Sequence, residues 1–217
     1  MRTARLVAIL GVIFLASGVG AAGAGTITGT AVAGPGGFGS GSTVTGLPNN
    51  DDSVGFGNTN NIILSETFAS IAPIDAVFTV ADSTPAGTTE YFATNVTVNN
   101  NTGVTWTDFH FQLIPTTAGD GLDFDFPTPN PTPTSSSFTV LVHGEDTIDW
   151  SGGAVPPGPT FFSLSIDVPD GLAGGTFTLR SVPTVPEPST AAIVGSGLLS
   201  LFGYGWWRRN RANRAGD

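Results

Sequence analysis

Cysteine and lysine are both missing from the 217-residue sequence, and each absence excludes a class of function. Without cysteine the chain has no disulfide framework, no thiol nucleophile, no cysteine-ligated zinc and no iron–sulfur cluster. Without lysine, seven arginines oppose seventeen acidic residues, and the formal net charge is −10. A chain this acidic cannot hold a nucleic-acid backbone by charge, so we expect no DNA or RNA partner.

Charged residues make up only 11% of the chain, and they are unevenly placed. Six of the seven arginines lie within the first five or the last ten residues. Residues 25–186 hold fifteen of the seventeen acidic side chains and a single basic one, Arg180. Two basic, apolar ends therefore flank an acidic middle, and the three parts have separate roles.

The N-terminal part has the order of a Sec-type signal peptide. Two arginines within the first five residues precede an apolar run over residues 6–16 and then a stretch of small residues. Ala22 and Ala24 fit the A-x-A cleavage pattern. We expect export through the Sec translocon and cleavage after Ala24, with cleavage after Ala21 or an uncleaved anchor as alternatives. The predicted signal peptide is residues 1–24.

The C-terminal part contains an apolar stretch long enough to cross a membrane. Ala191–Trp207 is seventeen uncharged residues, which span about 26 Å as a helix. Aromatic residues close the stretch, as at a membrane–water interface, and an arginine cluster follows: Arg208, Arg209, Arg211 and Arg214. The positive-inside rule keeps these arginines cytoplasmic, so the acidic middle would face outward.

A Pro-Glu-Pro motif, Pro186-Glu187-Pro188, stands directly ahead of that predicted helix. The motif, helix and arginines together, residues 186–214, resemble the PEP-CTERM sorting signal of Gram-negative bacteria. The resemblance implies processing by an exosortase, a precursor in the inner membrane, a final place at the cell surface or in the extracellular matrix, and an association with extracellular polysaccharide or biofilm. Two prolines keep the motif extended and accessible. The alternative is an ordinary membrane anchor behind a proline linker.

The middle of the chain, residues 25–185, has the pattern of strands and turns. Turn-forming residues interrupt it about every eight to twelve residues, with apolar and polar residues alternating between them. One apolar face per strand predicts an all-β domain, an antiparallel β-sandwich of roughly eight to eleven strands with jelly-roll or immunoglobulin-like topology. The predicted faces are Phe92, Thr94, Val96 and Val98; Phe109, Phe111 and Leu113; Phe138, Val140 and Val142; Phe162, Leu164, Ile166 and Val168; and Phe177 and Leu179.

Three segments between these runs read as connections. Asn99–Gly103 is rich in residues that tolerate positive φ, which predicts a hairpin turn. The proline-, threonine- and serine-rich residues 127–137 predict an extended surface loop. Residues 34–61, rich in glycine, serine and asparagine, are expected to be the least ordered part of the domain.

Three short segments also resemble stretches that recur in the ectodomains of PEP-CTERM proteins. They are Asn100–Phe111, Asp146–Trp150 and Phe177–Arg180. The similarity extends the family resemblance into the middle of the chain, but it implies no catalytic residue.

The sequence offers little for catalysis. His110 lies two residues from Asp108 on one strand face, which makes an Asp–His pair plausible, and His143 ends a predicted strand. No segment resembles a nucleophile elbow. We therefore expect no catalytic residues and a non-enzymatic protein, with a secreted hydrolase as a distant alternative.

Two acidic clusters invite comparison. Asp120, Asp123 and Asp125 form one, and Glu145, Asp146 and Asp149 form the other. Oxygen-rich clusters can hold Ca²⁺, which takes six to eight oxygen ligands. The first cluster is therefore a candidate calcium site, the only metal or cofactor considered, although neither cluster matches an EF-hand or RTX repeat. The alternative is a pair of solvated acidic loops.

Trp106 and Trp150 border polar residues, and strand alternation places Trp106 on the face opposite Phe109. A tryptophan exposed on a sheet face can stack on sugar rings, so the alternative function is a carbohydrate-binding module that uses these two residues. Tryptophans at the edge of the core are the commoner arrangement.

Overall fold

A computed structural model describes residues 25–44, 60–82, 87–114, 120–129, 131–172, 175–185 and 199. The predicted signal peptide and sorting motif lie outside these residues, as does the predicted C-terminal helix apart from residue 199. Over the residues that are described, no helix is long and apolar enough to span a membrane.

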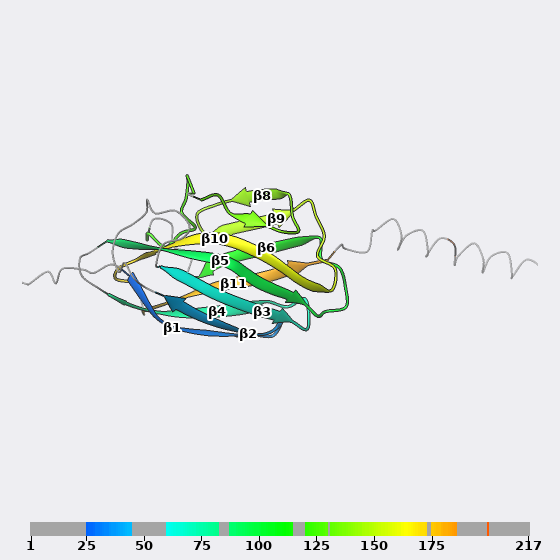
Figure 1. Cartoon of the computed structure of the whole chain (residues 1–217), viewed down its shortest axis with the longest axis horizontal. Helices are drawn as coiled ribbons and strands as arrows, with labels where there is room; N and C mark the ends of the chain where they lie inside the picture. Colours follow the sequence, from blue (N-terminus) through cyan, green and yellow to red (C-terminus); the bar gives the residue numbers. More distant parts are fainter. Residues whose placement is uncertain are drawn as a thin grey trace, which may run out of the picture.

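The described part of residues 25–185 is all-β, as the alternation predicts (Figure 1). The eleven strands are β1 (Gly25–Gly34), β2 (Gly37–Val44), β3 (Asn61–Phe68), β4 (Ile74–Asp82), β5 (Thr88–Asn100), β6 (Asp108–Ile114), β7 (Thr134–Ser135), β8 (Val140–His143), β9 (Thr147–Ser151), β10 (Gly158–Pro169) and β11 (Thr176–Thr184). Hydrogen bonds join them in one sheet, in the order β7-β10-β5-β3-β2-β1-β4-β11-β6-β9-β8. Every named pair is antiparallel except β3 with β5.

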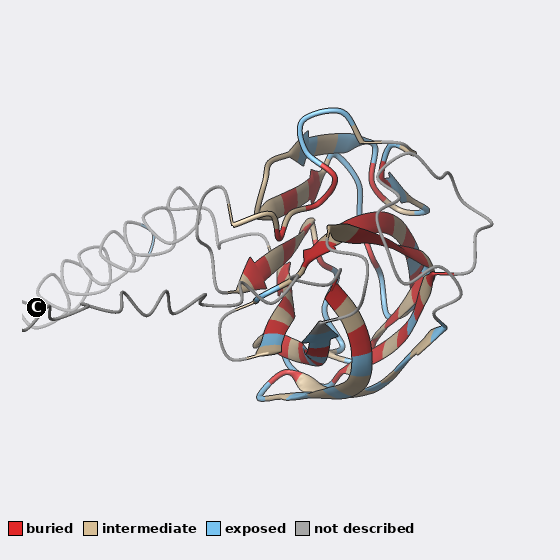
Figure 2. Cartoon of the chain, turned by 90° about the vertical axis from the view of Figure 1, so that its left-hand side faces the viewer, coloured by how far each residue is buried: buried red, intermediate tan, exposed pale blue. Residues whose placement is uncertain are grey.

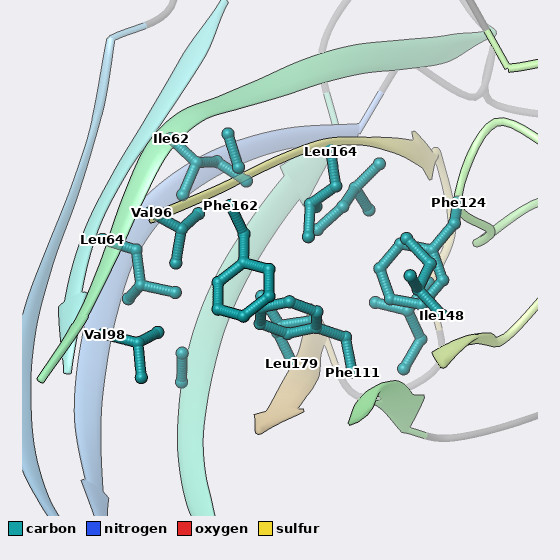
Figure 3. Packing of buried hydrophobic residues seen from close by; sticks show 14 of the residues in the cluster. Ile62, Leu64, Val96, Val98, Phe111, Phe124, Ile148, Phe162, Leu164 and Leu179 are labelled. Carbon is teal, nitrogen blue, oxygen red and sulfur yellow. The ribbon is translucent and has the colours of Figure 1, made fainter. Parts of the chain in front are cut away.

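The sheet curls so that its two halves share one apolar interior. Figure 2 shows buried and more exposed residues alternating along the strands, as expected when one face of each strand packs inward. Phe111 of β6 and Phe162 of β10 come from opposite halves, with ring centroids 5.2 Å apart, and Figure 3 shows both rings beside Leu179 of β11. The interior is thus a single aromatic and aliphatic core.

Three of the predicted strand faces are confirmed, and their residues are buried. They are Phe109, Phe111 and Leu113 of β6, Phe162, Leu164, Ile166 and Val168 of β10, and Phe177 and Leu179 of β11. The pairing of β6 with β11 is regular, so the period of two is kept along both strands. In β10 the register shift relative to β5 falls between Phe162 and Leu164, and the alternation of β10 itself continues through it.

The predicted face of β5 is wrong in its first half. The register with β10 shifts between Phe162 and Leu164, and Asn95 of β5 has a positive φ of 57°. Such a bulge adds one residue and reverses the alternation. Val96 therefore belongs to the core cluster together with Ala93, whereas Phe92 is buried outside that cluster.

The predicted face of residues 138–142 is also wrong. Phe138 is buried, but Val140 and Val142 are 47% and 60% exposed. Phe138 precedes β8 rather than belonging to it, so the alternation does not run through the whole segment. The inward side of this edge strand is instead occupied by Leu141, which packs against the core.

Residues 99–103 do not form a hairpin turn. β5 pairs with β3 and β10, and β6 pairs with β9 and β11, so the connection crosses between the halves of the curled sheet. The Asn100 side chain supports this crossover: its Nδ2 donates to the carbonyls of Val104 and Val155 at 2.8 and 2.9 Å. Asn100 thus has a structural role in joining the two halves.

The glycine-rich segment predicted to be least ordered contains β2, which lies between β1 and β3 near the centre of the sheet order. Glycine is required there by close packing. A Cβ on Gly39 would lie 2.6 Å from Val32 Cγ1 and would also clash with the Ser65 carbonyl. In the predicted surface loop at residues 127–137, the described residues, which exclude 130, contain no strand other than the two-residue β7 at an edge of the sheet.

Candidate functional site

Both tryptophans expected to contact a glycan are buried. Trp106 is 0% exposed and Trp150 is 4% exposed, so neither ring can stack on a sugar. Trp150 follows the alternation of β9, on the same side as the buried Ile148. The interpretation of these two residues as an exposed binding pair is therefore wrong.

Trp106 is misplaced by the sequence pattern because β6 begins only at Asp108. The backbone of Trp106 forms an isolated bridge with Val155, so the β6 alternation does not extend back to it. Its ring packs edge-on against Phe68 at 5.2 Å, and its Nε1 donates to Thr102 Oγ1 at 3.1 Å. The side chain is a core element with one satisfied polar atom.

His110 has a carboxylate partner, but it is Asp149 and not Asp108. The two residues are directly opposite each other on β6 and β9, and His110 Nδ1 lies 2.7 Å from Asp149 Oδ1. Asp108 instead accepts hydrogen bonds from Thr107 and Thr184. The pair is on the outer face of the sheet, with side chains 36% and 43% exposed.

The residues directly opposite His110 and Asp149 do not complete a catalytic triad. The row across the sheet continues with Val182 on β11 and Val142 on β8, which supply no nucleophile. The next row contains Arg180, whose guanidinium makes two hydrogen bonds to Asp75 at 2.8 and 2.9 Å. The hydrogen bond to Asp75 raises the pKa of Arg180 above the ordinary value of a guanidinium group. The His110–Asp149 and Arg180–Asp75 contacts are therefore cross-strand pairs on the surface of the sheet.

His143, predicted to end a strand, is the last residue of β8. Its Nε2 donates to the Phe124 carbonyl at 2.6 Å, which ties the end of β8 to the acidic segment 120–126. The sequence predicts the position of His143 but not this contact, because the contact joins residues nineteen apart that share no strand.

The structure brings the two acidic clusters together. The Phe124 amide donates to the Glu145 carbonyl at 3.0 Å, and the Leu113 amide donates to the Asp146 carbonyl at 2.9 Å. Burial and the charges of Glu145 and Asp120 raise the pKa of Asp146. Burial raises the pKa of Asp123, and the charges of Asp125 and Glu145 add to it. The combined cluster is therefore one electrostatic unit. Asp149, counted with Glu145 and Asp146 in the sequence, pairs with His110 instead.

The carboxylates predicted to bind calcium also shape the local backbone. Asp120 Oδ1 accepts the Leu122 amide at 2.9 Å, and Asp123 Oδ1 accepts the Phe126 amide at 3.0 Å. Across the described ranges, no three or more His, Asp and Glu side chains are grouped so that they could hold a metal ion. Calcium binding by Asp120, Asp123 and Asp125 remains a prediction.

Glu66 is a buried acid that the sequence analysis did not single out. It lies on the inward face of β3 with 0% exposure, and burial raises its pKa from 4.5 to about 8. Ser181 Oγ of β11 donates to Glu66 Oε1 at 3.0 Å, while Oε2 has no hydrogen-bond partner. The alternation of β3 places Glu66 between Leu64 and Phe68 and could have identified it as an inward-facing acid.

The outer surface of β2, β3, β5 and β10 differs from these acidic regions. We call one region of its solvent-accessible residues the open face, with Val44, Asn61 and Asp167 lying outside it: Phe38, Ser40, Ser42, Ile63, Ser65, Thr67, Asn95, Thr97, Asn99, Pro159, Phe161 and Ser163. None of these side chains is charged, and eight bear a hydroxyl or an amide group. The alternation of Phe38, Ser40 and Ser42 with glycines is the sequence pattern that could have revealed it.

Comparisons with protein-family models, with curated proteins and with solved structures found no match. The functional argument therefore depends on the residues of this chain alone.

Proposed function

We propose that this chain is an exported, non-enzymatic surface or extracellular-matrix protein whose C-terminal tail is recognised and processed by an exosortase. The proposed export route is the Sec translocon, and the proposed precursor is held in the inner membrane of a Gram-negative bacterium by the helix over Ala191–Trp207. The residues that would be recognised are Pro186, Glu187 and Pro188. The association with extracellular polysaccharide or biofilm is part of the same proposal.

The observation that favours this proposal is the extent of the described β-strands. β11 ends at Thr184, and Val185 is half-buried against the core. The Pro-Glu-Pro motif begins at the next residue, 186. At the other end, the described residues begin at Gly25, the residue after the preferred signal-peptide cleavage site, and Gly25 is already part of β1. The β-domain thus fits the interval between the two predicted sorting segments.

We also propose that the curled sheet is a strongly bent form of the expected β-sandwich. Its two halves face each other across one core, and β6 and β10 contact through stacked rings as opposed sheets would. Within this proposal the topology of the sandwich is either jelly-roll or immunoglobulin-like.

The test is a mass measurement on the protein recovered from the envelope and the medium of a host with an exosortase. We expect the wild-type chain to lose the segment after residues 186–188. Changing Pro186 and Glu187 to alanine should leave membrane insertion intact but block this loss, because the helix and the arginines are unchanged. The matched control changes the neighbouring Ser189 and Thr190 to alanine and should be processed normally.

A second variant separates orientation from recognition. Replacing Arg208, Arg209, Arg211 and Arg214 with glutamine should disturb orientation or retention, since these residues supply the positive-inside charge. Recovery of all wild-type protein with Ala191–Trp207 intact would reduce the tail to a plain anchor and would refute the proposed processing.

A further inference from the structure

The open face is an uncharged surface on a strongly acidic protein. The chain has a formal net charge of −10. The outer side of β4, β11, β6 and β9 has charged groups on every strand, among them Asp75, Arg180, Asp108 and Asp149. The open face has none, although it extends across four strands, which Figure 1 shows side by side. On β5 and β10 the acidic side chains of Glu90 and Asp167 also alternate outward, opposite each other and nearer the other ends of these strands, so the uncharged region is local to the open face.

Two phenylalanine rings flank this face. Phe38 on β2 is 65% exposed and Phe161 on β10 is 44% exposed, with β3 and β5 between their strands. Three strand spacings separate β2 from β10, or about 14 Å. Ile63, 57% exposed, belongs to β3, one of the strands between theirs, but it lies beyond the row of Phe161 and not between the two rings. Large exposed apolar side chains gathered on one face mark an interaction surface.

Between the rings the surface consists of short polar side chains. Ser40, Ser65 and Thr97 are aligned by strand pairing into one row that leads to Phe161. A second row joins Phe38 to Thr67 and Asn99. Apart from the Thr97 hydroxyl, which donates to the Asn95 carbonyl at 3.2 Å, these polar side chains make no hydrogen bond to another described residue. Their donors and acceptors are available to a ligand.

We propose that the open face binds a neutral polysaccharide that lies across β2, β3, β5 and β10. Sugar hydroxyls both donate and accept hydrogen bonds, which matches serine, threonine and asparagine side chains. The C–H faces of sugar rings pack on the faces of Phe38 and Phe161, whose π-systems are electron-rich. A charged polymer would lose hydration here without gaining an ionic partner, so the absence of charge favours a neutral one.

A second copy of the chain fits this face less well. The cores of protein–protein interfaces are apolar and depleted in serine, whereas here hydroxyl and amide side chains separate Phe38, Ile63 and Phe161 from one another. The proposal deepens the polysaccharide association within the proposed function and rests on that part of it. It does not depend on the tail, so loss of polysaccharide binding and loss of processing can be observed separately.

The experiment is affinity electrophoresis of the full chain in a detergent without a sugar headgroup. Gels contain hydroxyethylcellulose, dextran or mannan as neutral polymers, and alginate as a carboxylated one. We expect retardation by at least one neutral polymer, little change with added salt, and none by alginate. The double substitution Phe38→Ala with Phe161→Ala should weaken binding about tenfold or more, since two stacking contacts are lost.

The matched control is Val140→Ala with Val142→Ala, which removes two exposed apolar side chains from β8, outside the open face. This variant should bind like the parent. Folding of each variant is checked by circular dichroism. Binding to none of the three neutral polymers would overturn the proposal, as would undiminished binding by the folded phenylalanine variant. A parent dimer that the phenylalanine substitutions convert to a monomer would assign the face to a second copy instead.

Discussion

The rings of Phe109 and Phe162 stack with centroids 4.9 Å apart and an interplanar angle of 24°, although six strands separate β6 from β10 in the sheet order. Neighbouring strands of a sheet are about 4.8 Å apart, so an unbent sheet would keep these rings far from each other. Their contact therefore shows that the sheet curls until β6 and β10 face each other. Phe162 also contacts Phe111 and Trp150, so it lies at the centre of the aromatic core.

Phe162→Ala should therefore lower the free energy of unfolding by about 3–5 kcal/mol, because it leaves a large cavity between the two halves. The adjacent Phe161 points outward, and Phe161→Ala should change stability by less than about 0.5 kcal/mol. Urea denaturation of residues 25–185, which contain the whole core and should fold alone, measures both. Equal losses in the two variants would show that the inward face of β10 is assigned incorrectly.

Tryptophan fluorescence tests the burial of Trp106 and Trp150. These are the only tryptophans within residues 25–185. Because both rings are enclosed by the core, the folded domain should emit at short wavelength and resist quenching by iodide, and unfolding in urea should remove both properties. Efficient quenching of the folded domain would restore an exposed tryptophan as a candidate glycan contact.

Glu66 should make the stability of the domain depend on pH. Its pKa is about 8 in the folded state and near 4.5 when unfolded. Between these values the folded state keeps a proton that the unfolded state releases, so stability should fall as pH rises, by up to about 1.4 kcal/mol per pH unit. Below the lower pKa and above the higher one, this dependence disappears.

Glu66→Gln should remove that part of the pH dependence and should make the domain more stable than the parent at pH 9. The Ser181 hydrogen bond lowers the pKa of Glu66 in the folded state. Ser181→Ala should therefore raise that pKa, and the fall in stability with pH should continue to a higher pH. Urea denaturation at pH 5, 7 and 9 measures both effects. An unchanged slope in Glu66→Gln would mean that the acid is solvated or ionised in the folded state.

The acidic cluster should respond to removal of one charge. Burial, and then the like charges of Glu145 and Asp120, raise the pKa of Asp146, so Asp146→Asn should stabilise the domain at pH 7 by roughly a few tenths of a kcal/mol, the scale of exposed charge pairs. Asp170→Asn, made outside the cluster, is the control. Thermal denaturation at low ionic strength measures the difference, and 1 M salt should reduce it.

Calcium provides a separate test of the same region. If Asp120, Asp123 and Asp125 bind calcium as predicted, the melting temperature should be higher with millimolar calcium than with chelator at constant ionic strength, and an identical melting temperature would contradict the prediction. A higher melting temperature with calcium, lost in Asp123→Asn, would establish the predicted site, since a ligand that binds only the folded state adds stability.

The alternation of apolar and polar residues was enough to predict the inward face of strands that contain no bulge. Phe109, Phe111 and Leu113 are assigned inward by a period of two, and the same holds for Phe177 and Leu179. The all-β class likewise follows from local pattern, because alternation and turn residues act over a few neighbouring positions. The two predicted sorting segments are also properties of sequence order, and they lie outside the described residues.

Other assignments required the tertiary structure because they depend on contacts between distant segments. One extra residue at Asn95 reverses the face of β5, and the bridge to Val155 turns Trp106 inward. The partner of His110 is decided by the pairing of β6 with β9, thirty-nine residues apart. The open face arises in the same way: Phe38 and Phe161 share a surface only because β3 and β5 pair in parallel between their strands. The sequence by itself determines the strand class and the order of the segments, because these follow from neighbouring residues. The register of the strands and the curl of the sheet depend on packing between segments that are distant in the chain.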